Sequence, residues 1–340
     1  MLTQRTIGLW GTVAMLTLTV GLATPRQAQA GLVFLGSVGG YGSGSGQFIG
    51  PVGVDATGHI WVADTWNNRI EELNGAGGFV QAFGSYGAGN GQFRGPQAVV
   101  VDPLGNIWVA DTSDNRLEEF TSGGTFIRSV GSLGSGNGQL HSPQALAIGG
   151  SGNLWVADTY NNRIEEFSGA GTFLAAFGGA GSGAGQLLYP SGLAVDSSGN
   201  VWVADSYNNR VQEFTSGGVF IRALGGIGAG DGQFNHPYGV ALDSMGDVWV
   251  TDSGNGRLEE FTSSGQFMQS YGTMGSDVGQ FLLPAGLAFD NAGNLWVADS
   301  GNDRLEEFAV PDVATPEPAT MSLLALGLAG LAMARLRRGK

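Results

Sequence analysis

The sequence predicts an all-β fold, a six-bladed β-propeller of four-stranded antiparallel blades, from two repeated features. The motif Trp-Val-Ala-Asp, once as Trp-Val-Thr-Asp, recurs at a constant step of 47 residues. It begins at Trp61, Trp108, Trp155, Trp202, Trp249 and Trp296. Each repeat also holds four short apolar segments separated by Gly, Asn and Asp turns. This period with four strands per unit is typical of propeller blades.

The unit that begins at Gly138 shows the predicted elements in order. An inter-blade turn ends at Pro143, and four strands follow, joined by three turns. The strands are expected at residues 145–148, 154–157, 163–167 and 172–177. Because each strand is short and bounded by turn residues, one repeat makes one antiparallel blade.

The phase of the repeat predicts how the ring closes. Fourth-strand segments occur six times, at residues 33–38, 79–83, 126–130, 173–177, 220–224 and 267–271. The last set of first three strands ends at Phe308, and no fourth strand follows it. The N-terminal segment 33–38 is therefore expected to complete the last blade, so that residues 31–309 form one propeller without an open blade.

Composition excludes several kinds of chemistry. The chain has no cysteine, which excludes disulfides and thiolate sites. Between residues 31 and 315 it carries 9 Arg, no Lys and 28 acidic residues, a net charge near −19. An acidic body repels phosphate backbones, so we expect no nucleic-acid partner. Without Lys, the body also has no Schiff-base residue.

The N-terminal segment has the pattern of a signal peptide. Residues 1–30 contain Arg5, an apolar run from Ile7 to Ala23, and the sequence Ala28-Gln29-Ala30. Small residues on both sides of Gln29 fit cleavage after Ala30 and hence export. An uncleaved membrane anchor is the alternative.

The C-terminal segment has three parts. A linker, 310–318, contains Pro316, Glu317 and Pro318, and it is followed by an apolar run, 319–334, and a basic tail, 335–340. Sixteen helical residues rise about 24 Å, less than the ~30 Å hydrocarbon core, which suits a transient membrane contact. The basic tail would stay on the cytoplasmic side. A tail anchor that is not removed is the alternative.

This three-part tail resembles the PEP-CTERM sorting signal of Gram-negative bacteria. The resemblance implies that an exosortase recognises and cleaves the chain near Pro316-Glu317-Pro318, in strains that make exopolysaccharide. It also implies export through the inner membrane to the cell surface or the extracellular space.

The repeat itself resembles the NHL repeat. The residues that carry the likeness are Gly-Gln-Phe-x-x-Pro, Val-Asp-x-x-Gly-Asn, Trp-Val-Ala-Asp and Asn-Asn-Arg-Ile, through most of residues 33–308. The resemblance implies the propeller fold. It implies no single activity, because that family includes both binding platforms and enzymes.

Residues present in every repeat are interpreted as structural. An Asp after the second strand precedes an Arg by five residues, and a bidentate Arg–carboxylate bond there would fix the loop between strands two and three. The pairs are Asp64 with Arg69, Asp111 with Arg116, Asp158 with Arg163, Asp205 with Arg210, Asp252 with Arg257, and Asp299 with Arg304. A single ligand site would not require the same Asp–Arg pair in all six repeats, so we expect these pairs to stabilise the fold.

Residues that differ between repeats are the candidate ligand-binding residues. They lie in the loop between strands two and three and around the Pro that precedes strand one, which share a face at the channel mouth. They are Trp66, Arg94, Gln97, His141, Gln144, Tyr160, Tyr189, Tyr207, His236 and Tyr238. Aromatic rings with polar neighbours suit sugar rings or peptide segments. The alternative is an ordinary decorated loop surface.

The sequence thus predicts a secreted surface or matrix protein that binds exopolysaccharide or a surface protein. The alternatives are a metal-assisted propeller lyase or hydrolase and a structural matrix protein without a ligand. The chain has only three His, at His59, His141 and His236, which make a poor zinc or iron site. We therefore predict no catalytic residue, no metal ligand and no cofactor, although calcium held by carbonyls and Asp is compatible with the sequence.

Overall fold

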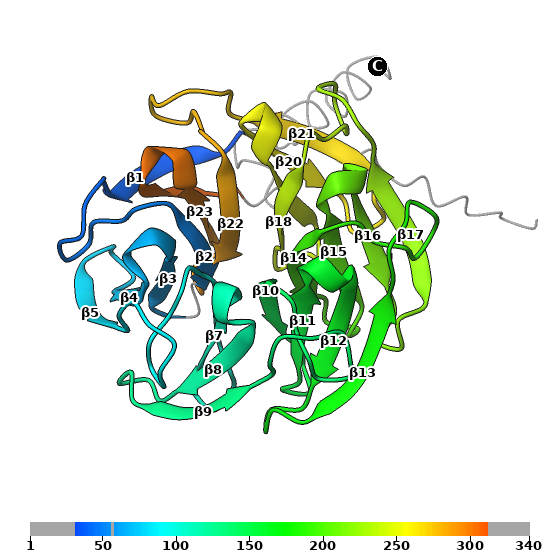
Figure 1. Cartoon of the computed structure of the whole chain (residues 1–340). Coiled ribbons are helices and arrows are strands. Elements are labelled where there is room, and N and C mark those ends of the chain that lie inside the picture. The colour runs from blue at the N-terminus through cyan, green and yellow to red at the C-terminus, as the bar shows by residue number, and fades with distance from the viewer. Residues whose placement is uncertain (1–30, 56–57, 312–340) are drawn as a thin grey trace, which may run out of the picture. The chain divides into compact units, whose positions relative to one another are not determined.

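A computed structural model describes residues 31–55 and 58–311 (Figure 1). These residues form six four-stranded antiparallel sheets arranged as blades around a ring, which confirms the predicted fold class. Residues 1–30 and 312–340, and hence the predicted signal peptide, sorting motif, apolar run and basic tail, lie outside the described part. Within that part, no helix has the length and apolar character needed to cross a membrane.

Each blade begins with an inner strand at the channel and ends with an outer strand at the rim. Blade one contains β2 (Pro51–Asp55), β3 (Ile60–Asp64), β4 (Arg69–Leu73) and β5 (Phe79–Phe83). Blade two contains β6 (Pro96–Val101), β7 (Ile107–Asp111), β8 (Arg116–Phe120) and β9 (Phe126–Val130). Blade three contains β10 (Pro143–Ile148), β11 (Leu154–Asp158), β12 (Arg163–Phe167) and β13 (Phe173–Gly178).

The other three blades follow the same order. Blade four contains β14 (Pro190–Val195), β15 (Val201–Asp205), β16 (Arg210–Phe214) and β17 (Phe220–Gly225). Blade five contains β18 (Pro237–Leu242), β19 (Val248–Asp252), β20 (Arg257–Phe261) and β21 (Phe267–Tyr271). Blade six contains β22 (Pro284–Phe289), β23 (Asn294–Asp299), β24 (Arg304–Ala309) and β1 (Val33–Gly39).

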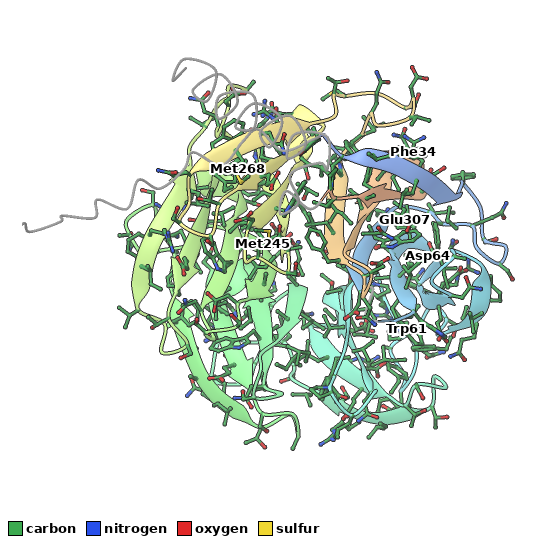
Figure 2. The ribbon with its side chains drawn as sticks, turned by 180° about the vertical axis from the view of Figure 1, so that it is seen from behind. Phe34, Trp61, Asp64, Met245, Met268 and Glu307 are labelled. Atoms are coloured by element: carbon green, nitrogen blue, oxygen red, sulfur yellow. The ribbon has the colours of Figure 1, made fainter. Side chains whose placement is uncertain are left out.

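Blade six joins the two ends of the propeller, as the phase of the repeat predicted. Strand β1 pairs antiparallel with β24 from Val33↔Ala309 to Gly39↔Arg304. Figure 1 shows the blue β1 beside the orange strands of this blade. Phe34 packs edge to face against Phe308, with ring centroids 5.8 Å apart, and Figure 2 shows Phe34 from the other side of the molecule. Each sheet therefore has its full four strands.

The core lies between neighbouring blades. Trp108 of blade two is fully buried and packs in one cluster with Leu154 and Phe167 of blade three. The second strand of a blade, such as Leu154–Asp158, is buried at every residue. Each blade covers the apolar surface of the next. Burial of a large side chain such as Trp108 therefore contributes about 2–3 kcal/mol only when the blade that covers it is present.

The alternating strand directions create two faces with different loops. The inter-blade segments and the loops between strands two and three lie on one face, which we call the Asp–Arg face. Each of these loops contains a 3-10 turn: η1 (Thr65–Asn67), η2 (Thr112–Asp114), η3 (Thr159–Asn161), η4 (Ser206–Asn208), η5 (Ser253–Asn255) and η6 (Ser300–Asn302). The tight turns between strands one and two and between strands three and four lie on the opposite, hairpin face.

Candidate functional site

The repeated Asp holds the Asp–Arg face together from a buried position. In blade three, Asp158 is fully buried, and its Oδ1 accepts the backbone N–H of His141 at 2.6 Å. Its Oδ2 accepts Asn161 Nδ2 and Arg163 Nε, both at 2.7 Å. Burial raises the pKa of Asp158, and these hydrogen bonds oppose that effect. One carboxylate thus joins η3 to the segment that precedes strand one.

The repeated Arg holds the preceding inter-blade segment rather than gripping the Asp with two bonds. All six Arg–Asp pairs use Nε and Oδ2, at 2.7–2.9 Å. In blade three, Arg163 donates its remaining N–H groups to the carbonyls of Ser135, Gly136 and Gln139, at 2.7–2.8 Å. The expected bidentate geometry was therefore wrong, because these carbonyls occupy the two terminal nitrogens.

A buried Glu on the third strand lies beside each Arg in five blades. Glu165 is fully buried, and Arg163 pairs with it at 2.8 Å. In blade four Gln212 stands there instead, and its Nε2 donates to Gln186 O at 2.7 Å and to Asp205 Oδ2 at 3.0 Å. Burial raises the pKa of the corresponding acids, to about 7 for Glu71, Glu118, Glu165 and Glu306, and to about 8 for Glu259.

Five of the ten candidate ligand-binding residues form a continuous row of rings over blades three to five. We call this row the aromatic arc: His141, Tyr160, Tyr189, Tyr207 and His236. Consecutive ring centroids lie 5.0, 5.3, 4.7 and 5.2 Å apart. Tyr160 and Tyr207 are 50% and 57% exposed, so the arc presents aromatic surface to solvent.

Backbone bonds place the rings of the arc. The N–H of Tyr160 in η3 donates to His141 O at 3.1 Å, which sets these two side chains next to each other. Tyr189 and His236 stand before the Pro that opens strand one, with φ of 50° and 53°, and Asn162 and Asn209 of the preceding blades accept their N–H groups at 2.9 Å. Blades one and two have Gly at this left-handed position. Tyr and His there cost about 1 kcal/mol each in backbone strain.

A cavity of about 400 Å³ adjoins the arc on the side of the channel. Tyr160, Tyr189, Tyr207 and His236 line it, together with polar residues of the first strands and the 3-10 turns. These include Gln144, Ser191 and Tyr238. Phenol, amide and hydroxyl groups therefore face a space bordered by aromatic rings, an arrangement suited to a polyhydroxylated ligand.

Three further candidates meet at the central channel. Gln97, Gln144 and Tyr238 line a narrow cavity of about 80 Å³. The Tyr238 hydroxyl donates across the channel to Gln97 Oε1, at 3.4 Å. Burial raises the pKa of Tyr238, so its phenol stays neutral and remains a hydrogen-bond donor.

The remaining two candidates lie apart from the arc. Trp66 is 73% exposed, and its indole packs over the backbone of Gly50 in blade one. Arg94 pairs with Asp114 at 3.3 Å and lies 5.6 Å from the ring centre of Tyr86. The sequence could not separate these two residues from the arc, because they occupy the same repeat positions as its members.

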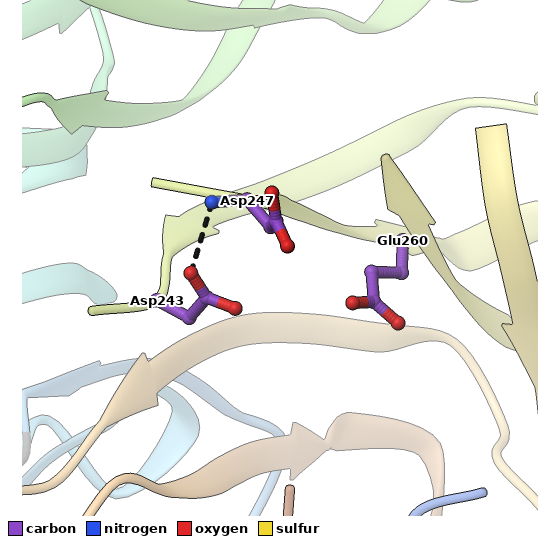
Figure 3. Close-up of side chains that lie close together, drawn as sticks. All are labelled: Asp243, Asp247 and Glu260. Atoms are coloured by element: carbon purple, nitrogen blue, oxygen red, sulfur yellow. Dashed lines mark hydrogen bonds between the residues drawn. The ribbon is translucent and has the colours of Figure 1, made fainter. Parts of the chain in front are cut away.

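One group of side chains on the hairpin face could hold a metal ion, and the sequence analysis missed it. Asp243, Asp247 and Glu260 each offer a carboxylate oxygen within 4.8 Å of the others, the only such group of three in the described residues (Figure 3). The Asp247 N–H donates to Asp243 Oδ1 at 2.9 Å. The available signal was the residue at position 247, because four other blades have Asn there: Asn106, Asn153, Asn200 and Asn294.

The fold and the repeat define the class of this protein as a six-bladed β-propeller. The NHL repeat matches residues 93–120, 140–167, 187–214, 234–261 and 281–308. The PEP-CTERM protein-sorting motif matches residues 314–338. The chain is therefore an NHL-repeat propeller protein with a C-terminal PEP-CTERM sorting motif, which confirms both resemblances.

Several solved structures share this fold. Virginiamycin B lyase from Staphylococcus aureus is 18% identical with a TM-score of 0.57, over 79% of this chain and 82% of that one. A gluconolactonase from Xanthomonas campestris is 14% identical with a TM-score of 0.61, over 83% and 98%. At such identities the likeness shows the fold alone. No curated protein matches the sequence.

Proposed function

We propose that this protein binds a neutral carbohydrate chain on the aromatic arc at the surface of a Gram-negative cell. The PEP-CTERM motif signals export to the cell surface and implies recognition by an exosortase. A propeller delivered there meets exopolysaccharide and other surface molecules. The motif does not indicate a ligand, and the proposed binding role of the Asp–Arg face rests on the geometry of the arc.

The single observation that carries the proposal is the unbroken row of five rings. Aromatic faces pack against the C–H faces of sugar rings, and neighbouring polar groups bond the hydroxyls. Tyr160 and Tyr207 supply exposed rings, and Gln144 and Ser191 supply polar groups in the adjoining cavity. Tyr189 and His236 occupy a left-handed position that is also non-Gly in blades three and six, as Ser142 and Leu283, so their rings and not backbone strain support the proposal.

Charge favours a neutral ligand over an anionic one. The body carries a net charge near −19 and no Lys. No Arg lines the cavity beside the arc within the described residues, and Arg94, the one Arg among the candidate ligand-binding residues, is paired with Asp114. An acidic protein without a local basic cluster repels carboxylated or sulfated polymers.

The direct test measures retention of the protein by exopolysaccharide from the producing strain in affinity electrophoresis. We expect the double variant Tyr160→Ala, Tyr207→Ala to bind at least about tenfold more weakly, because packing of a sugar ring on an aromatic ring contributes ~1 kcal/mol per ring. Tyr86→Ala is the matched control, since Tyr86 is 70% exposed on the same face and outside the arc. Equal retention of both variants would contradict the proposal.

A second variant separates binding from folding. Tyr189→Gly removes a ring from the middle of the arc and also removes the left-handed strain, so its stability should stay within about 1 kcal/mol of the parent. Thermal melting checks stability, and affinity electrophoresis checks binding. If the parent protein itself is retained by neither exopolysaccharide nor surface proteins, a structural matrix role without a ligand is favoured instead.

A further inference from the structure

Blade two contains an internal guanidinium site on its hairpin-face side. Arg128, on outer strand β9, pairs through Nε with Glu119 on β8. Its guanidinium carbon lies 5.9 Å from the ring centre of Trp108, and its Nη1 donates to Ala170 O in the next blade at 2.6 Å. The site thus combines a carboxylate, an indole ring and a loop carbonyl. Blade four repeats the first two features with Arg222, Glu213 and Trp202, at a ring distance of 5.5 Å.

Blade three retains the Glu and the Trp of this site and lacks the Arg. Glu166 and Trp155 occupy the positions of the Glu and the Trp, but the residue paired with Glu166 on the outer strand is Ala175. Among residues 31–55 and 58–311, no Arg forms an ion pair with Glu166. Glu166 is consequently only half-buried, whereas Glu119 and Glu213 are at most 2% exposed.

A second substitution enlarges the space. Gly149 stands where the other blades have a turn Asp, and a Cβ added to it would lie 3.2 Å from Trp155 Nε1. Gly149 lines a cavity of about 270 Å³ together with Trp155, Glu166 and Ser216 among others. Ala175 is not a lining residue, but it is the strand partner of Glu166, which is one. Ser216 lies in the blade-four loop that corresponds to the blade-three loop of Ala170.

Blade six has only one of the two substitutions. It too lacks a long outer-strand side chain, since Gly36 pairs with Glu307. It keeps its turn acid, however, and Asp290 Oδ2 accepts the indole N–H of Trp296 at 3.3 Å. Only blade three combines Gly at the turn with a short outer-strand residue opposite the Glu.

We propose that the blade-three cavity binds a guanidinium group, presented as an arginine side chain by another molecule. The ligand would pair with Glu166, lie against Trp155 and donate to the loop of blade four, as Arg128 does one blade earlier. A planar guanidinium suits this combination better than an ammonium group, because it stacks on a ring while it bonds a carboxylate. The site lies on the hairpin face and does not depend on the carbohydrate proposal.

The test uses the nuclear magnetic resonance signal of the Trp155 indole N–H, assigned by its loss in Trp155→Phe. Nα-acetyl-arginine amide is titrated into the purified protein, and the neutral citrulline analogue and the lysine analogue serve as comparisons. We expect a saturable shift with the arginine compound, and an affinity at least about tenfold lower for the citrulline analogue and for Glu166→Gln, because each removes one charge of the pair. An arginine titration that leaves the signal unmoved overturns the proposal.

A substitution in the chain itself gives the stricter control. Ala175→Arg supplies the guanidinium found in blades two and four, so it should abolish binding of the arginine compound and raise the melting temperature. Leu174→Arg adds the same charge on the other side of β13, where Leu174 is 48% exposed, and should leave binding within about twofold of the parent. Binding that persists in Ala175→Arg would place the ligand elsewhere and contradict the proposal.

Discussion

Two residues of one short loop, Asp158 and Tyr160, show how this propeller separates stability from recognition. Asp158 is fully buried, bonds three partners and has a counterpart in every blade. Tyr160 is 50% exposed and contacts His141 and Tyr189, and the other blades have Trp66, Ser113, Tyr207, Gly254 and Gly301 at its position. A network repeated around the ring holds the backbone in place, so the residue beside it is free to differ from blade to blade.

The largest expected effect comes from opening the ring. Deletion of residues 31–39 removes β1 and its pairing with β24, and it exposes Phe308 in the cluster between blades five and six. We expect a loss that exceeds about 5 kcal/mol, comparable to the whole stability of a typical domain. Calorimetry checks this, and a melting transition equal to that of the parent would show that the sixth blade does not need its N-terminal strand.

The comparison within the loop is tested directly by two single substitutions. Asp158→Ala leaves Arg163 Nε, Asn161 Nδ2 and the His141 N–H without their acceptor, at a cost of about 3–5 kcal/mol. Tyr160→Ala should cost about 1 kcal/mol or less, because the ring is half exposed. Urea unfolding of both variants measures the difference, and similar losses would mean that the ring of Tyr160 is itself structural.

The buried acids of the third strands predict a dependence of stability on pH. Their folded pKa of about 7, or about 8 for Glu259, exceeds the ordinary value of 4.5 because burial disfavours the charged form. The folded protein therefore holds protons that the unfolded chain has released, and the unfolding free energy falls as pH rises from about 4.5 to about 8.

Gln212 provides the matched variants for this prediction. Glu165→Gln copies blade four and should make the decline with pH shallower, whereas Gln212→Glu should make it steeper. Arg163 and Asp158 are the charged groups that face Glu165, and both remain unchanged. Melting temperatures recorded from pH ~5 to ~9 provide the measurement, and parallel curves for the three proteins would show that these acids are ionised throughout.

The smallest expected effect concerns the acids of blade five. In blade two, Asn106 Nδ2 donates to Glu119 at 2.9 Å, whereas Asp247 places a second carboxylate near Glu260. Asp247→Asn should stabilise the protein by about 1 kcal/mol at neutral pH, because an amide can donate where a carboxylate repels. Asn106→Asp is the converse control in thermal melting, and a loss of stability in Asp247→Asn would reverse the interpretation.

The repeated residues predicted the fold because each of them occurs at the same place in every repeat, and so indicates that the same contact forms in every blade. The constant step of the Trp motif and the missing fourth strand after Phe308 were enough to place β1 in blade six. The spacing of Asp158 and Arg163 predicted their pairing but not its geometry. The terminal nitrogens of Arg163 donate to backbone carbonyls of the inter-blade segment, and the five-residue spacing says nothing about the position of that segment.

The candidate site was predictable as a set of positions but not as a surface. The sequence identified all five members of the arc, but it grouped them with Trp66 and Arg94. A repeat position shows which loop a residue occupies and does not show how far that loop lies from the loops of other blades. The blade-three cavity escaped notice for a different reason. It is marked by small residues where other blades have larger ones: Gly149 in its lining, and Ala175 as the strand partner of its Glu166.

The pairing of Gly39 with Arg304 has a consequence for how the chain is made. Strand β1 is synthesised first, and its partner β24 is synthesised last, so the sixth blade forms only when almost the entire repeat array exists. Closing so long a segment is entropically slow, and until then the edge of β1 lies open to other partners. A prematurely terminated chain can therefore never seal its ring, which makes completeness of translation a precondition for a closed, protease-resistant propeller.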